Sequence, residues 1–505
     1  MGLLSRLATY FMPRKVVEVE ASSTLDNLQR EDHDTYWAKA SGGSADAMAS
    51  PEFRRLTRNR ARMEVQNNAW LQGMLETYVS MVLGTGVRLQ IIPEESSKSQ
   101  LAAANKVEKL WNEWVEETEY FTELRSMIFA RVQDGESFGV LETAINDVPV
   151  QLQMRAYEAD FFGDPWGRSA YLLDRNRWYD GIRFDSSRRA ASYFKFKEHP
   201  GAYLSRGLGG DGSPIPADYV CHLLKKRRPG QSRALTELLA VLDLMVDLRR
   251  YRDAAVKAAR KAANISVFIE SNMEPGEADE LEEGPFTTIP LPQDAIMNLP
   301  DGWKGNAIKA EHPTMTYDAF TLAIMREAAR CIPLPIAVAT GDSSQMNYAS
   351  GRLDKQAGDL VIDCDRKLLD RTCNNKTFRE WYREAQSIPG FLPRLGKFKV
   401  RWQYDGRRHV DPMKEANAVS KLSEANLLDE ERYWSETFGL SLDEAYEAIA
   451  RVREAKERHG LTDIANVSTA NAKGPARDGG SRRRKNPKTP VAQQRQQSGW
   501  ENANE

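Results

Sequence analysis

The segment best placed for nucleotide chemistry runs from Gly390 to Lys397 of this 505-residue chain. A phosphate-binding loop has four residues between its two glycines, then a lysine, then a Ser or Thr hydroxyl for Mg²⁺. Here five residues separate Gly390 from Gly396, and Phe398 stands in the hydroxyl position. Pro393 also removes a backbone amide that a phosphate would need. The sequence therefore does not predict nucleotide binding at this loop.

Three aspartates, Asp359, Asp363 and Asp365, are the nearest approach to a metal site. Asp359 and Asp363 lie four residues apart on a predicted helix and share one face, whereas Asp365 points elsewhere. A calcium site needs six to eight converging oxygens, so a solvated helix face is the favoured interpretation. The six histidines are scattered, and the sequence contains neither HExxH nor GxSxG. We therefore expect no catalytic residue, no metal and no cofactor, and we expect that the protein is not an enzyme.

The cysteines and the charge balance limit the class of protein further. The four cysteines form no CxxC pair, which argues against a disulfide framework or zinc site and favours small core residues in a reducing compartment. They are Cys221, Cys331, Cys364 and Cys373. With 70 basic and 72 acidic residues the net charge is -2, so any contact with nucleic acid must use local patches.

The N-terminal segment predicts a short amphipathic helix. Arg6 interrupts its apolar run, which also lacks a small-residue cleavage site, so a secretory signal is not predicted. No stretch reaches the roughly 18 apolar residues of a membrane span, so we expect no membrane association.

Residues 51–230 combine helical and strand patterns. Ser50 can cap a helix with Pro51 in its first position, and the pattern then continues as one helix to the Gly84-Thr-Gly86 turn. Further helices are expected around 102–117, with Trp111 and Trp114 on one side, and over 121–133. Strands follow through about residue 224.

A long helix is predicted over 231–262, and it has two contrasting faces. Five basic residues fall within roughly a 120° sector, where they would face water or an anion. They are Arg249, Arg250, Lys257, Arg260 and Lys261. The opposite face holds small residues that would let a neighbouring helix approach closely. These are Ala254, Ala255, Ala258, Ala259 and Ala262.

The chain then becomes acidic and proline-rich over 263–294, with no Lys or Arg. Beyond it we expect a helix at 315–331, a polar loop over 333–350 and a long helix at 351–386. A strand at 397–404 and three short helices over 411–460 follow. The composition of 466–505 cannot bury a core, so this tail is expected to be disordered. Together these patterns predict an α+β, mainly helical protein.

Several of these elements, taken in order, resemble the lambda-type portal proteins of bacteriophages. The resemblance begins with residues 54–91, where an Arg- and Asn-rich helix, a hydrophobic stretch, a GxG turn and a Leu-Gln strand follow one another. It continues with short elements in the order of the family. They are Asp134-Gly135-Glu136, Arg228-Pro229-Gly230-Gln231-Ser232-Arg233, Pro333 to Pro335, Asn347-Tyr348-Ala349-Ser350 with Arg352, and Asp411-Pro412 with Glu415-Ala416.

The resemblance implies a portal fold with wing, stem, clip and crown regions. The expected parts are a flexible arm (1–50), an α/β wing (51–230), a stem helix (231–262), the clip (263–312), a second stem helix (315–332), a tunnel loop (333–350), the wing's long helix and strand (351–410), the crown (411–465) and a basic tail (466–505). Each subunit would belong to a ring, usually a dodecamer, that conducts dsDNA at a capsid vertex of the virion after assembly in the host bacterial cytoplasm. Expected partners are the terminase large subunit, head-completion or neck proteins, and the major capsid and scaffold proteins.

Three sets of residues are the candidate functional sites under this resemblance. The tunnel loop is expected to touch a sliding duplex through Asp342, Ser343, Ser344, Gln345, Met346, Asn347 and Tyr348. The basic residues of the first stem helix form the second set. The third set, expected to dock basic protein partners rather than DNA, comprises Glu274, Glu277, Glu280, Glu282 and Glu283.

Two other classes of protein are alternatives. A packaging ATPase or nuclease is disfavoured by the missing phosphate loop and carboxylate cluster. A non-viral DNA-binding protein would instead use the basic tail, in which Arg482 to Lys485 are consecutive cations.

Overall fold

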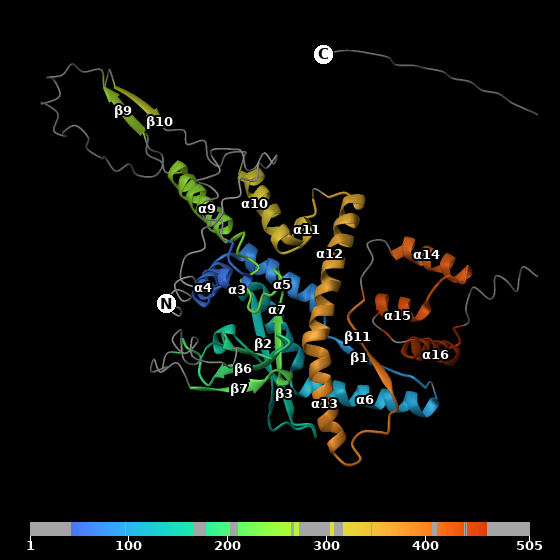
Figure 1. Ribbon diagram of the computed structural model, residues 1–505. Helices are drawn as coiled ribbons and strands as arrows, with labels where there is room; N and C mark the ends of the chain where they lie inside the picture. The colour runs from blue at the N-terminus through green and yellow to red at the C-terminus, as the bar shows by residue number, and fades with distance from the viewer. Residues whose placement is uncertain are drawn as a thin grey trace, which may run out of the picture. The chain divides into compact units, whose positions relative to one another are not determined.

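The structure is a computed structural model (Figure 1) that describes residues 42–95, 97–164, 178–202, 211–263, 267–271, 303–307, 317–344, 346–406, 412–438, 440 and 442–461. The chain divides into two units, residues 1–439 and residues 440–505. The described part consists mostly of helices, together with four sheets of two to four strands. The expected α+β, mainly helical class is confirmed.

The first long helical stretch is two helices, not the single helix that its periodicity predicts. Helix α4 (Pro51–Asn67) begins as expected, because the Ser50 side chain accepts a hydrogen bond from the backbone amide of Phe53. It is followed directly by α5 (Ala69–Leu83). Between them Asn68 is extended, and its side chain accepts from the amides of Trp70 and Leu71. An asparagine cap thus interrupts an apolar pattern that continues through it.

An aromatic cluster centres the main core. Helix α6 (Lys98–Glu117) buries Trp111 and Trp114 completely, with ring centroids 4.8 Å apart, so the prediction that both lie on one side is confirmed. Helix α7 (Tyr120–Asp134) adds Tyr120 to this cluster. From the second half of the chain, Trp381 packs edge-on against Trp111 at 5.3 Å.

Two sheets join distant parts of the chain. Strand β1 (Arg88–Pro93) pairs antiparallel with β11 (Phe398–Gln403), and Ile91 lies opposite Val400. Strand β2 (Glu136–Thr143) is the centre of a three-stranded sheet, between β3 (Leu152–Tyr157) and β8 (Val220–Leu224). A four-stranded sheet follows the order β4 (Trp178–Tyr179), β5 (Ile182–Phe184), β6 (Ala190–Phe196) and β7 (Gly212–Pro216). A separate pair is formed by β9 (Val267–Ser271) and β10 (Trp303–Ala307).

Helix α9 (Leu242–Ala263) begins later than the predicted 231–262 helix. Residues 231–241 form turns because their polar groups are used elsewhere. The backbone amide of Glu237 donates to the carbonyl of Val132, and the guanidinium of Arg233 is buried against Glu136. Tertiary hydrogen bonds therefore override the helical pattern of this segment.

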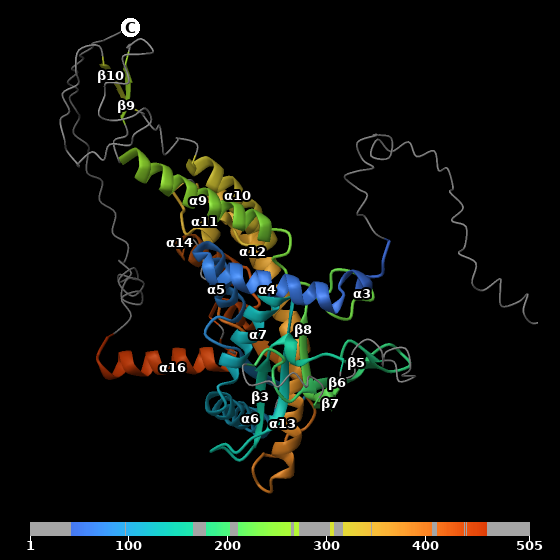
Figure 2. The ribbon, with the colours of Figure 1, turned by 90° about the vertical axis from the view of Figure 1, so that its left-hand side faces the viewer.

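Helix α10 (Tyr317–Cys331) agrees with the predicted helix at 315–331. It runs beside α9 in both views (Figures 1 and 2), and the ring of Tyr251 stacks on Tyr317 at 5.5 Å. Ala255 and Ala258 lie four and seven residues beyond Tyr251, so they share its face of α9. Ala255 and Ala258 of the alanine face therefore turn toward α10 of the same chain.

The segment after α10 contains a short helix, α11 (Ile336–Thr340), where only a loop was expected. The predicted long helix is continuous over α12 (Tyr348–Leu369) and α13 (Asn375–Ser387), with a π-helical turn at Asp370–Asn374 between them. The expectation that every cysteine is a core residue is wrong for Cys364, which is exposed on α12.

The three short helices expected over 411–460 are present. Helices α14 (Pro412–Glu424) and α15 (Glu430–Phe438) belong to the first unit. Helix α16 (Leu442–Arg458) belongs to the second and ends just before Gly460, which has a positive φ of 66°. No described helix combines the length and the apolar character that a membrane crossing requires. The smaller elements are α3 (Ala45–Met48) and the 3-10 turns Ala159–Phe161 and Ala217–Tyr219.

Candidate functional site

The loop between α11 and α12 presents polar side chains to solvent. Gly341 ends α11 with a φ of 68°, a conformation that glycine adopts without strain. Asp342, Ser343 and Ser344 follow and are exposed. The amide of Ser344 donates to Asp342 Oδ1 at 2.8 Å, and this bond lowers the pKa of the Asp342 carboxyl. The loop is therefore folded on itself, with two serine hydroxyls facing outward.

The end of the loop serves the start of α12. Asn347 caps the helix: its Oδ1 accepts from the amide of Ser350 at 2.9 Å, and Ser350 Oγ accepts from the amide of Asn347 at 3.3 Å. Met346 is half-buried, and its amide donates to the carbonyl of Ser343 at 3.1 Å. Of the expected tunnel-loop residues, Gln345 lies outside the described residues, as does the side chain of Tyr348. Asn347 and Met346 thus have structural roles that the sequence alone did not suggest.

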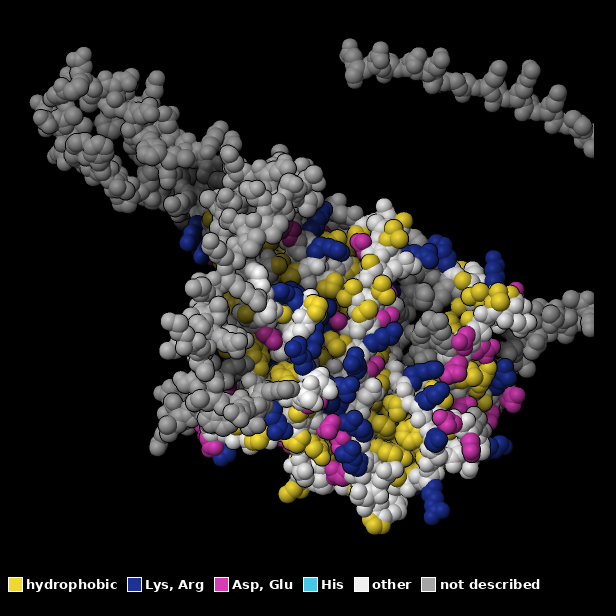
Figure 3. Space-filling model, in the orientation of Figure 1, with side chains coloured by type: hydrophobic (Ala, Val, Ile, Leu, Met, Phe, Trp, Pro, Cys, Tyr) yellow, Lys and Arg dark blue, Asp and Glu magenta, His cyan; other side chains and the backbone are white. Residues whose placement is uncertain are grey.

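A mainly apolar groove of about 450 Å³ lies beneath this loop. It is bounded by α5, α11 and α12. The lining residues that the loop itself contributes are Ser343, Met346 and Asn347. In Figure 3 the face that carries α12 shows hydrophobic side chains interspersed with Lys and Arg.

The expected basic stripe on α9 is only partly available to an anion. Arg249 is half-buried and pairs with Glu64 of α4 at 2.9 Å. Arg250 pairs with Asp247 at 3.6 Å on the surface. Lys257 and Arg260 are exposed, and the side chain of Lys261 lies outside the described residues. The expected acidic set from Glu274 to Glu283 also lies outside them, so the structure does not bear on it.

A buried ion network centres on Glu136, the first residue of β2. Glu136 is fully buried, and Arg233 Nε donates to both of its carboxylate oxygens at 2.8 and 2.9 Å. His222 of β8 contacts the same carboxylate through Nε2 at 3.0 Å. Arg233 also donates to the carbonyl of Asp180 at 2.7 Å, and Asp180 in turn pairs with Arg54 of α4. The network therefore joins β2, β8, α4 and the turn segment before α9.

The charges in this network set the pKa values of Glu136 and His222. Burial alone would raise the pKa of Glu136, but the charge of Arg233 and the hydrogen bond from His222 hold it well below its usual range. Burial lowers the pKa of His222, and the carboxylate of Glu136 offsets only part of this shift. At neutral pH we therefore assign an ionised Glu136 and a neutral His222 that donates through Nε2.

A second buried network surrounds Arg131 of α7. Its guanidinium contacts Asp365 of α12 at 3.1 Å and Glu237 at 3.2 Å, and it donates to the Tyr78 hydroxyl at 2.9 Å. Asp365, one of the three aspartates weighed as metal ligands, is thus buried in an ion pair. Arg131 was not predicted from the sequence. Its signal was a lone cation at helical spacing from Leu124, Met127 and Ile128, all of which are buried.

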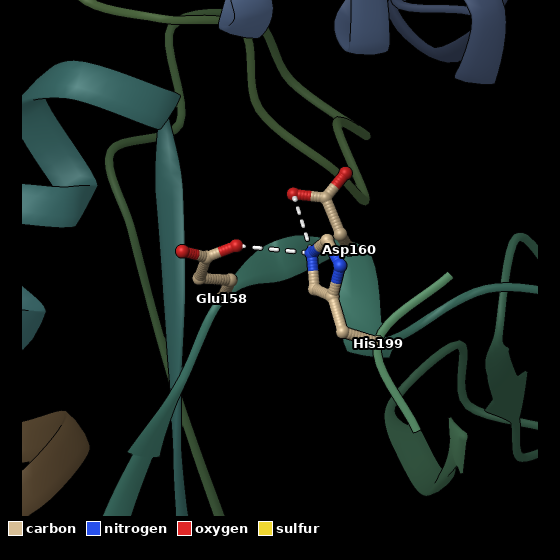
Figure 4. Close-up of side chains that lie close together, drawn as sticks. All are labelled: Glu158, Asp160 and His199. Carbon is tan, nitrogen blue, oxygen red and sulfur yellow. Dashed lines mark ion pairs between the residues drawn. The ribbon is translucent and has the colours of Figure 1, made fainter. Parts of the chain in front are cut away.

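One cluster in the described part of the chain has ligand atoms close enough for a metal ion: Glu158, Asp160 and His199. His199 Nε2 lies 3.0 Å from Glu158 and 3.9 Å from Asp160 (Figure 4). However, Arg62 and Arg58 each contact Asp160 at 2.8 Å. Two guanidinium groups already compensate these carboxylates, so the cluster is an ion-pair network and disfavours a further cation.

The comparison with known families decides the class of protein. The family model described as "Phage portal protein, lambda family" matches residues 31–358. The chain belongs to the lambda family of phage portal proteins. A curated relative, the "Probable portal protein" of Halomonas phage phiHAP-1, is 23% identical over 266 residues, or 50% of each chain. This portal protein therefore spans about half the length of the curated relative that it matches.

Three solved structures of gene transfer agent particles resemble this portal protein weakly. The virion of the native particle has a TM-score of 0.39 at 14% identity, covering 75% of this chain and 92% of the other. The neck of the empty particle, computed with C6 symmetry, has a TM-score of 0.42 at 13% identity with the same coverage. The neck of the native particle, computed with C12 symmetry, has a TM-score of 0.36 at 14% identity, covering 71% of this chain and 87% of the other. These scores are too low to carry an argument.

Two of the motifs on which the portal resemblance rested contact each other in the structure, and a third caps a helix. Glu136, from the Asp134-Gly135-Glu136 element, is bound by Arg233, from the element that ends at that residue. Asn347, from the Asn347 to Ser350 element, caps α12. The fold of the subunit therefore explains why these positions hold a glutamate, an arginine and an asparagine.

Proposed function

We propose that this portal protein forms a closed ring, a dodecamer, which conducts dsDNA into and out of a phage capsid at one vertex. The observation that carries the proposal is the match of the lambda portal family over residues 31–358. The portal family is structural, so we assign ATP hydrolysis and DNA cleavage during packaging to other proteins. The local chemistry supports this assignment, because the Gly390 to Lys397 loop lacks the hydroxyl and spacing of a phosphate site.

The tunnel loop, with Asp342 to Tyr348 as its candidate contacts, is proposed as the part that touches DNA. Ser343 and Ser344 are exposed, neutral hydrogen-bonding groups, and the exposed Asp342 is the one carboxylate among these residues. A conduit lined by many cations would bind the duplex tightly through counterion release and slow its movement. Neutral hydroxyls can contact a sliding duplex without that penalty.

The remaining parts follow the same proposal. Helices α9 and α10 form the stem, the acidic residues from Glu274 to Glu283 belong to the clip, and α14 to α16 belong to the crown. The clip would dock the terminase large subunit during packaging and the head-completion or neck proteins afterwards. The ring would contact the major capsid and scaffold proteins during assembly in the host cytoplasm, and would remain at the vertex of the virion.

A site-specific crosslink to DNA tests the loop assignment. Cys364 is first replaced by serine, because it is the exposed native cysteine. Ser344→Cys is then coupled to a photoactivatable crosslinker, and filled particles are irradiated. We expect a covalent adduct with DNA. Ser387→Cys, an exposed serine at the end of α13, serves as the matched control and should give none.

Deletion of residues 342–346 gives a second readout. The deletion leaves Asn347, and hence the cap of α12, in place. Rings should still form, while the yield of filled heads or the retention of packaged DNA should fall. A normal yield of filled, stable heads, or a crosslink from residue 344 to outer-shell protein alone, would contradict the assignment.

A further inference from the structure

Helix α9 has an exposed stripe whose charge changes along its length. Five exposed residues follow one another at alternating spacings of four and three residues, so they share one face. They are Asp243, Asp247, Arg250, Ala254 and Lys257. Tyr251, which contacts α10, lies beside this stripe, four residues beyond Asp247. The first two turns of the stripe are therefore acidic and exposed, and they flank the face of α9 that contacts α10.

Helix α10 has a matching stripe of opposite charge. Four exposed residues again follow one another at alternating spacings of four and three residues. They are Ala319, Ala323, Arg326 and Arg330. Ile324 and Ala328, on the face of Tyr317, are buried. Among the described residues, no ion pair involves Arg326 or Arg330. The last two turns of α10 therefore present two cations, directed away from α9.

The two stripes lie at the same end of the helix pair. Antiparallel packing with Tyr251 opposite Tyr317 and Phe320 fixes the relative height of the helices. Asp243 lies eight residues before Tyr251, about 12 Å along α9 at 1.5 Å per residue. Arg326 lies six residues beyond Phe320 and nine beyond Tyr317, which is about 9 Å and about 13.5 Å along α10. Asp243 is thus level with Arg326.

We infer that a second copy of this chain places its α10 stripe on the α9 stripe of the first, with Asp243 facing Arg326 of the next copy and with Asp247 and Arg330 on either side of that pair. This inference rests on the proposed ring. A rotational ring keeps every copy at the same height, so the register within one chain carries over to the contact between copies. The small Ala319 and Ala323 let the two helices approach closely. Opposite charges at the end near the wing then fix the register.

Charge reversal tests the pairing. Arg326→Glu with Arg330→Glu places four carboxylates together, and Asp243→Arg with Asp247→Arg places four cations together. Each double variant should lose rings and give monomers by mass photometry, with an unchanged circular dichroism spectrum. The variant that combines all four reversals should regain rings. The matched control, Arg326→Lys with Arg330→Lys, keeps the charge and should assemble normally.

Chemical crosslinking keeps the inference testable even where a charge reversal impairs folding. With Cys364 replaced by serine, Asp243→Cys and Arg326→Cys in one chain, treated with a short bis-maleimide, should give a ladder that extends beyond the dimer. Each single variant should give no ladder. Normal rings in both reversed double variants, a failure of the fourfold variant to regain them, or the absence of a ladder would overturn the pairing. Wild-type protein that forms no ring would instead overturn the proposed function.

Discussion

At the scale of single residues, the core around β2 encloses paired charges. Glu136 and Arg233 are both almost fully buried and are bonded in a bidentate geometry, with His222 as a third partner. Such a pair contributes little net stability relative to an apolar replacement of both members, but loss of one member leaves an uncompensated charge. The network should therefore be sensitive to single substitutions.

We expect Arg233→Met to destabilise the protein by about 3–5 kcal/mol, because Glu136 would remain buried without its cation. Urea unfolding monitored by tryptophan fluorescence gives the free energy. The control is Lys197→Met, which removes an exposed pair with Asp211 (side chains 67% and 73% exposed) and should cost about 0–1 kcal/mol. Equal effects of the two substitutions would contradict the assigned role of Arg233.

Stability should fall on acidification because both titrating groups of the network have lowered pKa values in the folded state. Unfolded His222 takes up a proton below about pH 6.5, whereas the folded protein keeps it neutral, so stability is lost as the pH falls from there. Glu136 adds a further loss below about pH 4.5, where the unfolded carboxyl is protonated. Unfolding free energies measured between about pH 8 and pH 5 should decrease, and His222→Gln should reduce that slope. An identical slope in the variant would show that His222 is not the group involved.

At the scale of elements, the turn segment 231–241 lies between β8 and α9. Its contact with Gly135 is unusually close: Gly135 has a φ of 96°, and a Cβ there would lie 2.3 Å from the carbonyl carbon of Leu235. The same segment supplies Arg233 to one buried network and Glu237 to the other. The segment that leads into α9 is therefore fixed by three independent contacts.

Gly135→Ala should destabilise the protein by at least about 1–3 kcal/mol, because alanine is strained at this φ and its methyl group meets backbone atoms. Gly73→Ala is the matched control. Gly73 lies within α5 and has open space where the methyl group of an alanine would lie, so alanine should stabilise that helix by about 0.5–1 kcal/mol. Thermal unfolding of both variants distinguishes them, and a neutral Gly135→Ala would show that the close approach is not required.

The elements differed in how well the sequence predicted them, for physical reasons. Ser50 followed by Pro51, and the alternation around Val400, are local signals that no distant contact opposes, and both predictions are confirmed. The break at Asn68 depends on a local side-chain cap, and the late start of α9 depends on tertiary hydrogen bonds; hydrophobic periodicity contains neither. Among the site residues, the polarity of Ser343 and Ser344 correctly indicated exposure. The cap that Asn347 forms with Ser350 is a local signal that was not used, whereas the role of Arg131 required knowing what lies beside it.

At the scale of the whole molecule, function depends on assembly. The family match identifies a portal protein, and the exposed stripes on α9 and α10 are the surfaces through which we infer that one copy contacts the next. A heterologous contact of this kind generates a closed ring when its rotation closes and an open filament when it does not. The central claim is that the rotation closes around a channel wide enough for a DNA duplex.

Electron microscopy of the purified full-length chain tests this claim most directly. Negatively stained particles should be rings of uniform size with a central hole, and class averages should show a single rotational symmetry, twelvefold under the proposal. Mass photometry of the same sample should give a mass near twelve times the 57.1 kDa of one chain. Monomers, open filaments or closed particles without a hole would contradict the account.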